Sequence, residues 1–178
     1  MADKRHLVVA VFEDETAATK AAEWLKEWDK IVKDPDGRKY GGIGVLTAGE
    51  DLEIKVHRVG RRDTGSGVGV GLALGLLAGG LTAGLSVLGG LAAGALAGGV
   101  GGGLLHRGLG MTPENLKRLA EQLCSGSAAV AVVVHESEVA VVTVQLTELG
   151  GQIEVHECSL PHLEEAAKAA GMPAEGPN

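Results

Sequence analysis

Alternating and periodic apolar positions divide the N-terminal part of the chain into strands and helices. Residues 6–12 are rich in valine and predict a buried strand, and residues 13–31 carry alanine, leucine and tryptophan at helical spacing and predict a helix. Residues 40–46 and 52–59 predict two strands, which the turn TAGED joins into a hairpin. The expected order here is strand, helix, strand, strand.

The C-terminal part has the same kinds of pattern. Thr112 followed by Pro113 is typical of a helix start, so we expect a helix that ends near Cys124. Further strands are predicted over 128–135 and 152–157, and a last helix over 159–170.

One segment, EVAVVTVQLTELGG, fits two structures. Its β-branched residues favour a strand. Val142 and Leu146 also fall on one helical face, and Gly150 and Gly151 would end a helix well. We favour a helix over 138–149, because a strand would follow the preceding strand with almost no turn residues between them.

These elements predict an α+β fold. Strand, helix, strand, strand, helix, strand is the ferredoxin-like βαββαβ order, a sheet with helices on one face, and a further helix and strand extend it. A glycine-rich helical hairpin is inserted between the third strand and the second helix. We expect a split ferredoxin-like cytoplasmic domain over 1–62 and 108–171, the hairpin over 63–107 and a flexible tail over 172–178.

The inserted run has no charged residue from Thr64 to Leu105. A phosphate-binding loop would need GxGxxG or Gly-Lys-Ser/Thr, and neither occurs. A flexible linker would be rich in serine and charge, whereas leucine, valine and alanine separate these glycines. Two helices of about 28 Å each, with a turn near 84–89, match the thickness of a bilayer core.

Glycine recurs every four residues in each half of the run. Such a repeat leaves a smooth groove on one helix face and lets helices pack closely in lipid. Six leucines would then face lipid or neighbouring chains: Leu72, Leu76, Leu77, Leu91, Leu96 and Leu104. We expect oligomerisation through two sets of glycines: Gly67, Gly71, Gly75 and Gly79, and Gly90, Gly94, Gly98 and Gly102.

Basic residues flank the run: Arg58, Arg61 and Arg62 precede it, and His106 and Arg107 follow it. Two spans place both flanks on one side, and basic flanks belong on the cytoplasmic side. We therefore expect an inner (cytoplasmic) membrane protein with both termini cytoplasmic. The alternative is a soluble self-assembling cage or shell in which hairpins bury one another.

Charge and candidate ligands narrow the possible chemistry. The net charge of −7 argues against nucleic acid, because phosphate binding needs clustered Lys and Arg. Two strands end in similar residues, and these are the candidates for a Zn, Ni or Cu site: His135, His156, Glu136, Glu157 and Cys158, with His57. Polar residues at solvated strand ends are the simpler interpretation, and we expect neither a metal nor another cofactor.

The pattern resembles a bacterial family of membrane-protein domains of unknown function, some of whose members are labelled general stress proteins. The segments that carry the resemblance are LVVAVFEDETAATKAAEWL at 7–25, the glycine-rich hairpin at 64–105, SAAVAVVVHES at 127–137 and LGGQIEVHECSL at 149–160. The resemblance implies a cytoplasmic αβ domain interrupted by a membrane-associated glycine-rich segment, and it supports the helix at 138–149. It brings no catalytic residues.

From these observations we expect a protein that is not an enzyme. It would be a membrane-associated homo-oligomer, with a role in stress implied only by the family, whose partners are other copies of itself and membrane lipid. A membrane-tethered domain that senses a metal or another ligand is a further alternative.

Overall fold

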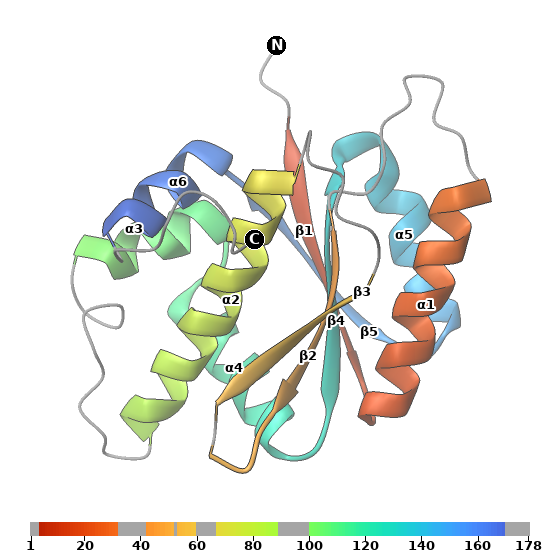
Figure 1. Cartoon of the computed structure of the whole chain (residues 1–178), viewed down its shortest axis with the longest axis horizontal. Coiled ribbons are helices and arrows are strands. Elements are labelled where there is room, and N and C mark those ends of the chain that lie inside the picture. Colours follow the sequence, from red (N-terminus) through yellow and green to blue (C-terminus); the bar gives the residue numbers. More distant parts are fainter. Residues whose placement is uncertain (1–3, 32–41, 52, 60–66, 89–99, 170–178) are drawn as a thin grey trace.

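The computed structural model describes residues 4–31, 42–51, 53–59, 67–88 and 100–169, which form a mixed α+β fold (Figure 1). Within these residues there are one five-stranded antiparallel sheet and six helices. Along the chain they are β1 (Arg5–Phe12), α1 (Glu15–Ile31), β2 (Ile43–Ala48), β3 (Ile54–Val59), α2 (Gly67–Leu88), α3 (Val100–Leu109), α4 (Pro113–Cys124), β4 (Ala128–His135), α5 (Glu136–Glu148), β5 (Gln152–Cys158) and α6 (Leu160–Ala169).

The strands lie in the order β3-β2-β4-β1-β5, and every neighbouring pair is antiparallel. All eight residues of the central strand β4 are buried. A strand that is covered on both faces needs no polar alternation, which explains its continuous apolar sequence AAVAVVVH. Strands β3 and β5 form the two edges of the sheet.

Helices cover both faces of this sheet. Along β1, Leu7 and Val9 belong to the hydrophobic cluster shared with α2 and α4, whereas Val8 and Ala10 belong to the cluster shared with α1 and α5. Figure 1 shows α1 and α5 on one side, and α2, α3, α4 and α6 on the other. The single helical layer that we expected is therefore incorrect. A sheet with apolar residues on both faces must be covered twice.

The predicted elements outside the glycine-rich run are present, and the start of α4 shows a local sequence signal that determines an element boundary. Pro113 opens α4, the Thr112 hydroxyl accepts a hydrogen bond from the Asn115 N–H (3.2 Å), and the Asn115 side chain accepts one from the Thr112 N–H (3.1 Å). This reciprocal cap satisfies backbone donors that the first helical turn leaves unpaired.

The ambiguous segment forms a helix, α5, which starts directly where β4 ends. His135 is its N-cap, and the His135 N–H donates to the Glu138 carboxylate (3.0 Å). The helix buries Val142 and Leu146 and ends before Gly150, which has a positive φ of 91°. The helix therefore starts directly after β4 without turn residues, and the Glu138 carboxylate in its first turn accepts the backbone N–H at its start.

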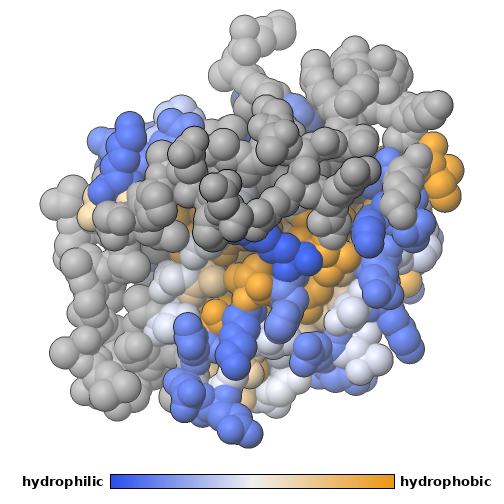
Figure 2. Space-filling view, viewed as in Figure 1, coloured by the Kyte–Doolittle hydropathy of each residue, from blue (hydrophilic) through white to orange (hydrophobic). Residues whose placement is uncertain are grey.

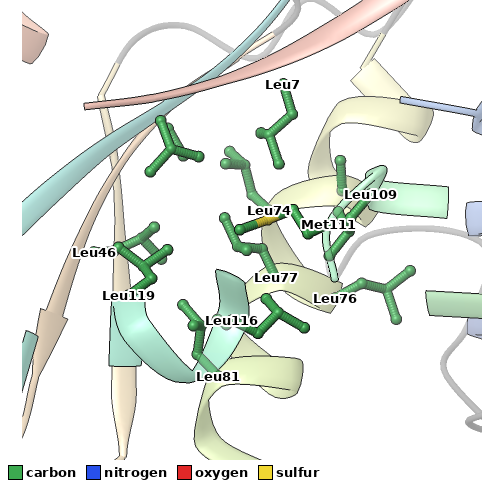
Figure 3. Packing of buried hydrophobic residues seen from close by; sticks show 14 of the residues in the cluster. Leu7, Leu46, Leu74, Leu76, Leu77, Leu81, Leu109, Met111, Leu116 and Leu119 are labelled. Carbon is green, nitrogen blue, oxygen red and sulfur yellow. The ribbon is translucent and has the colours of Figure 1, made fainter. Parts of the chain in front are cut away.

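The glycine-rich run contributes two helices, α2 and α3, and α2 is part of the core. Its leucines from Leu72 to Leu81 pack with side chains of the sheet and of α4, and Figure 3 shows Leu74, Leu77 and Leu81 in this cluster with Leu7, Leu116 and Leu119. Leu72, Leu76 and Leu77 are buried in the chain's own core, so the expectation that they face lipid or neighbouring chains is wrong for this structure. A helix that is apolar all round fits lipid and a protein core equally well.

Several expected boundaries lie outside the described residues. Helix α2 continues to Leu88, so the turn expected near 84–89 is wrong for residues 84–88, and residues 89–99 are not described. The expected domain boundaries at 62/63 and 171/172 also fall outside the described ranges, as does the tail over 172–178. The domain division remains a prediction.

Candidate functional site

The candidate metal ligands His135 and Cys158 lie on the two strands that flank β1. Both stand opposite Arg5 in the sheet register, so two strand spacings, about 10 Å, separate them. Ligands of one Zn ion lie within about 2.3 Å of it. Across the described residues, no group of three or more His, Cys, Asp or Glu side chains could hold a metal ion.

His156 lies beside an ion pair. It stands opposite Leu7, and its Nε2 lies 3.3 Å from the Glu154 carboxylate. Glu154 pairs with Arg118, which joins β5 to α4 on the sheet face that α2 covers. His57, a further candidate, is on β3 at the opposite edge of the sheet, so the structure does not bring it to this group.

The Cys158 thiol is buried, and its burial raises its pKa from 9.0 to about 11, although the positive charge of Arg5 opposes the shift. A thiol with this pKa is protonated at neutral pH, whereas metal binding and nucleophilic attack both require the thiolate. Cys158 therefore acts as a small apolar residue of the core at neutral pH.

Three of the predicted oligomerisation glycines, Gly71, Gly75 and Gly79, form a line along α2, which we call the glycine line. They are only partly buried, whereas the leucines between Leu72 and Leu81, on the other sides of α2, are buried. Residues four apart lie one above another on a helix, so the repeat places all three on one side. The glycine line is the least covered side of α2.

Two hydrogen bonds show that the glycine line runs beside the edge strand β3. At one end, Arg58 Nη2 donates to the Gly71 carbonyl (3.4 Å), and at the other the Ile54 N–H donates to Thr82 Oγ1 (3.1 Å). The β3 side of the molecule is the face seen in Figure 2, where hydrophilic and apolar residues lie side by side.

Internal packing does not require glycine at Gly71 or Gly79. A Cβ at Gly79 would meet no atom within 4 Å, and a Cβ at Gly71 would meet only the mobile end of the Arg58 side chain, at 3.4 Å. In a helix, glycine is less stable than alanine by about 1 kcal/mol. A smooth surface for another molecule would explain why glycine is present.

The remaining predicted residues are spread over the chain. Gly67 is the first residue of α2, Gly102 lies in α3, and Gly90, Gly94 and Gly98 lie outside the described residues. Of the flanking arginines, Arg58 lies on β3 and Arg107 on α3, whereas Arg61 and Arg62 are not described. None of the helices in the described ranges combines the length and the apolar character that a membrane span needs.

Sequence analysis missed glycines that allow close packing between elements. A Cβ at Gly44 of β2 would lie 3.2 Å from a methyl group of Leu74, and one at Gly108 would lie 2.7 Å from Leu163 of α6. Gly44 interrupts the apolar strand IGVLTA, and a glycine inside a strand is a signal of close approach by another element.

Comparison with protein families gives a match over the C-terminal part of the chain. The profile of a family described as "Protein of unknown function (DUF1269)" matches residues 66–169, more than half of the chain. The chain belongs to the DUF1269 family. This confirms the resemblance to a family of unknown function, and the match covers α2 to α6, including the glycine line. Searches among curated proteins and among solved structures give no significant match.

Proposed function

We propose that the protein is a non-enzymatic homo-oligomer whose copies associate through the glycine line of α2. The orientation of α2 supports this proposal, because the helix buries its leucines from Leu72 to Leu81 in the chain's own core and leaves the glycine line partly exposed. A glycine repeat allows close contact between molecules, and the stabilisation from that contact would offset the low helix propensity of glycine. Of the two settings that the sequence suggested, this arrangement favours an assembly in which protein covers the glycine-rich segment.

The experiment compares Gly79→Leu with Gly103→Leu by sedimentation velocity in buffer without detergent. Gly103 is a matched control, because it is an exposed helical glycine of α3 whose added Cβ would also meet nothing within 4 Å. The wild type and Gly103→Leu should sediment as the same oligomer, and Gly79→Leu as a smaller species. A monomeric wild type, or equal sizes for all three, would contradict the proposal.

A membrane-associated form is the second candidate, with membrane lipid as a partner and both termini on the cytoplasmic side of the inner membrane. The charge-free run from Thr64 to Leu105 and its basic flanks favour it. In this form the protein should stay with the membrane pellet after carbonate washing, and protease outside intact cells should leave tags at both termini intact. Cleavage of one tag, or release by carbonate, would exclude a two-span hairpin.

We further propose that the ferredoxin-like unit consists of β1–α1–β2 and β4–α5–β5. In support, β4 lies between β1 and β2, β1 lies between β4 and β5, and α1 and α5 pack on the same face. Strand β3 and helices α2, α3, α4 and α6 would then be additions that cover the second face and extend the sheet.

A further inference from the structure

We propose that neighbouring copies join edge to edge, with β5 of one copy beside β3 of the next. This inference rests on the proposed self-association and names the two surfaces that would meet. Both strands are edges of the same sheet, and an edge strand presents unpaired backbone donors and acceptors that another strand can use. At β3 the Ile54 N–H is already used, because it donates to Thr82 Oγ1.

The exposed side chains of the β3 edge are basic. Lys55, His57 and Arg58 are exposed, and Lys55 and Arg58 carry a positive charge at neutral pH. No Asp or Glu lies within the strand IKVHRV. We call this surface the basic edge.

The β5 edge carries charge of the opposite sign. Glu157 is exposed, Glu154 is partly exposed, and Val155 between them exposes 40% of its surface. No Lys or Arg lies within the strand QIEVHEC. We call this surface the acidic edge. Near its C-terminal end, α3 and its following turn already cover the backbone, because Ser159 N–H donates to the Gly108 carbonyl (2.8 Å).

The signs of the two edges select one pairing. Two basic edges or two acidic edges would bring like charges together, whereas a basic and an acidic edge attract. Because every neighbouring pair in the sheet is antiparallel, β3 and β5 run in the same direction. Copies in one orientation would therefore form a continuous sheet with a parallel pair at each joint.

Side chains of opposite charge also lie on matching faces. Arg58 and Glu154 are on the face covered by α2, since they stand opposite Gly44 and Val9 in register, and Lys55, His57 and Glu157 are on the other face. The glycine line borders the basic edge on the α2 side, and the open space at Gly79 leaves room there for a neighbour. Head-to-tail joints of this kind give rings or filaments rather than closed dimers.

The test reverses the charge of each edge in a separate full-length variant. Lys55→Glu plus His57→Glu makes the basic edge acidic, and Val155→Lys plus Glu157→Lys makes the acidic edge basic. All four residues are exposed, so both variants should fold. Arg58 and Glu154 are left unchanged because they bond to Gly71 and Arg118 within the chain. Lys20→Glu plus Glu23→Lys, on the exposed side of α1, is the matched control.

Each edge variant alone should lose at least tenfold in association affinity, measured by sedimentation at low salt, and the control should keep the wild-type size. An equimolar mixture of the two edge variants should recover the wild-type oligomer, because each reversed edge then meets its complement. Wild-type size for either variant alone, or a mixture that stays dissociated while both variants show wild-type circular dichroism, would overturn the inference. If the Gly79→Leu variant sediments as a smaller species while the edge variants keep the wild-type size, the proposed function stands and the edge pairing fails.

Discussion

At Gly110, which follows α3, the backbone leaves no room for a side chain. The residue has a φ of +65°, and an added Cβ would lie 2.2 Å from the Glu157 carbonyl oxygen. Both the left-handed backbone and the contact oppose any other residue. Gly110→Ala should therefore lower the free energy of unfolding by roughly 3 kcal/mol, measured by urea titration.

Two other glycines separate the causes of this effect. Gly126 has a φ of +102° but open space around its Cβ, so Gly126→Ala should lose only about 1 kcal/mol, the part due to backbone strain. Gly103→Ala, in the open on α3, should be neutral or slightly stabilising. Equal losses for Gly110→Ala and Gly126→Ala would show that the contact with Glu157 contributes nothing.

Cys158 predicts a pH dependence of stability. Because its pKa rises from 9.0 to about 11 on folding, the folded protein holds the thiol proton more tightly than the unfolded chain does. The resulting stabilisation is complete below pH 9 and is lost as the pH rises towards 11, by roughly 2–3 kcal/mol in total. Between about pH 8 and pH 11 the wild type should lose roughly 2 kcal/mol more than Cys158→Ala, in urea unfolding at each pH. Equal losses of unfolding free energy in the two proteins would refute this role of Cys158.

Among the elements, α2 and the sheet meet in one especially close contact. Leu74 packs where β2 has glycine, and a Cβ at Gly44 would lie 3.1 Å from Val56 and 3.2 Å from Leu74. Gly44→Val should destabilise the protein by about 1–3 kcal/mol through overpacking, and Leu74→Ala by about 2–5 kcal/mol through the cavity that it leaves. The double variant should lose less than the sum, because the smaller residue makes room for valine. Additive losses in urea unfolding would indicate that α2 does not pack on β2 in solution.

The sequence was informative wherever a local signal determines the structure. The Thr112–Pro113 start of α4 and the paired glycines after Leu149 fixed element ends, and the periodicity of Val142 and Leu146 selected a helix over a strand. The surroundings of α2 were beyond prediction, because an apolar helix rich in glycine shows no face that marks its partner. The face covered by each helix also depends on strand order, and β4 lies between β1 and β2 only because residues far apart in sequence pair.

The candidate site was predictable to a similar degree. The four-residue spacing correctly predicted that Gly71, Gly75 and Gly79 lie on one side of a helix. It could not predict that this side borders β3. His135 and Cys158 were grouped as candidate ligands because their two strands end in similar sequences. In the structure β1 lies between those two strands and separates the two residues. Which strands are neighbours is not a local property, so no spacing rule could have excluded that group.

For the whole molecule, the surroundings of α2 distinguish two forms: an assembly in which protein covers the glycine-rich segment, and a hairpin inserted in lipid. In the described fold Leu77 is fully buried and Gly79 is partly exposed, although they lie only two positions apart in the sequence. In a lipid-embedded helix both positions would be shielded from water alike. Single cysteines at these two positions, in a background with the exposed Cys124 replaced by serine, can report the difference.

With a water-soluble maleimide and dilute protein, Gly79→Cys should be modified at least tenfold faster than Leu77→Cys. Modification of Gly79→Cys should slow as the protein concentration rises, because copies that associate through the glycine line cover that position, whereas Leu77→Cys should stay slow throughout. The native Cys158 is buried and protonated, so it should add little background. Equal protection of both positions at every concentration, relieved only by detergent, would instead place α2 in lipid and favour the membrane-associated form.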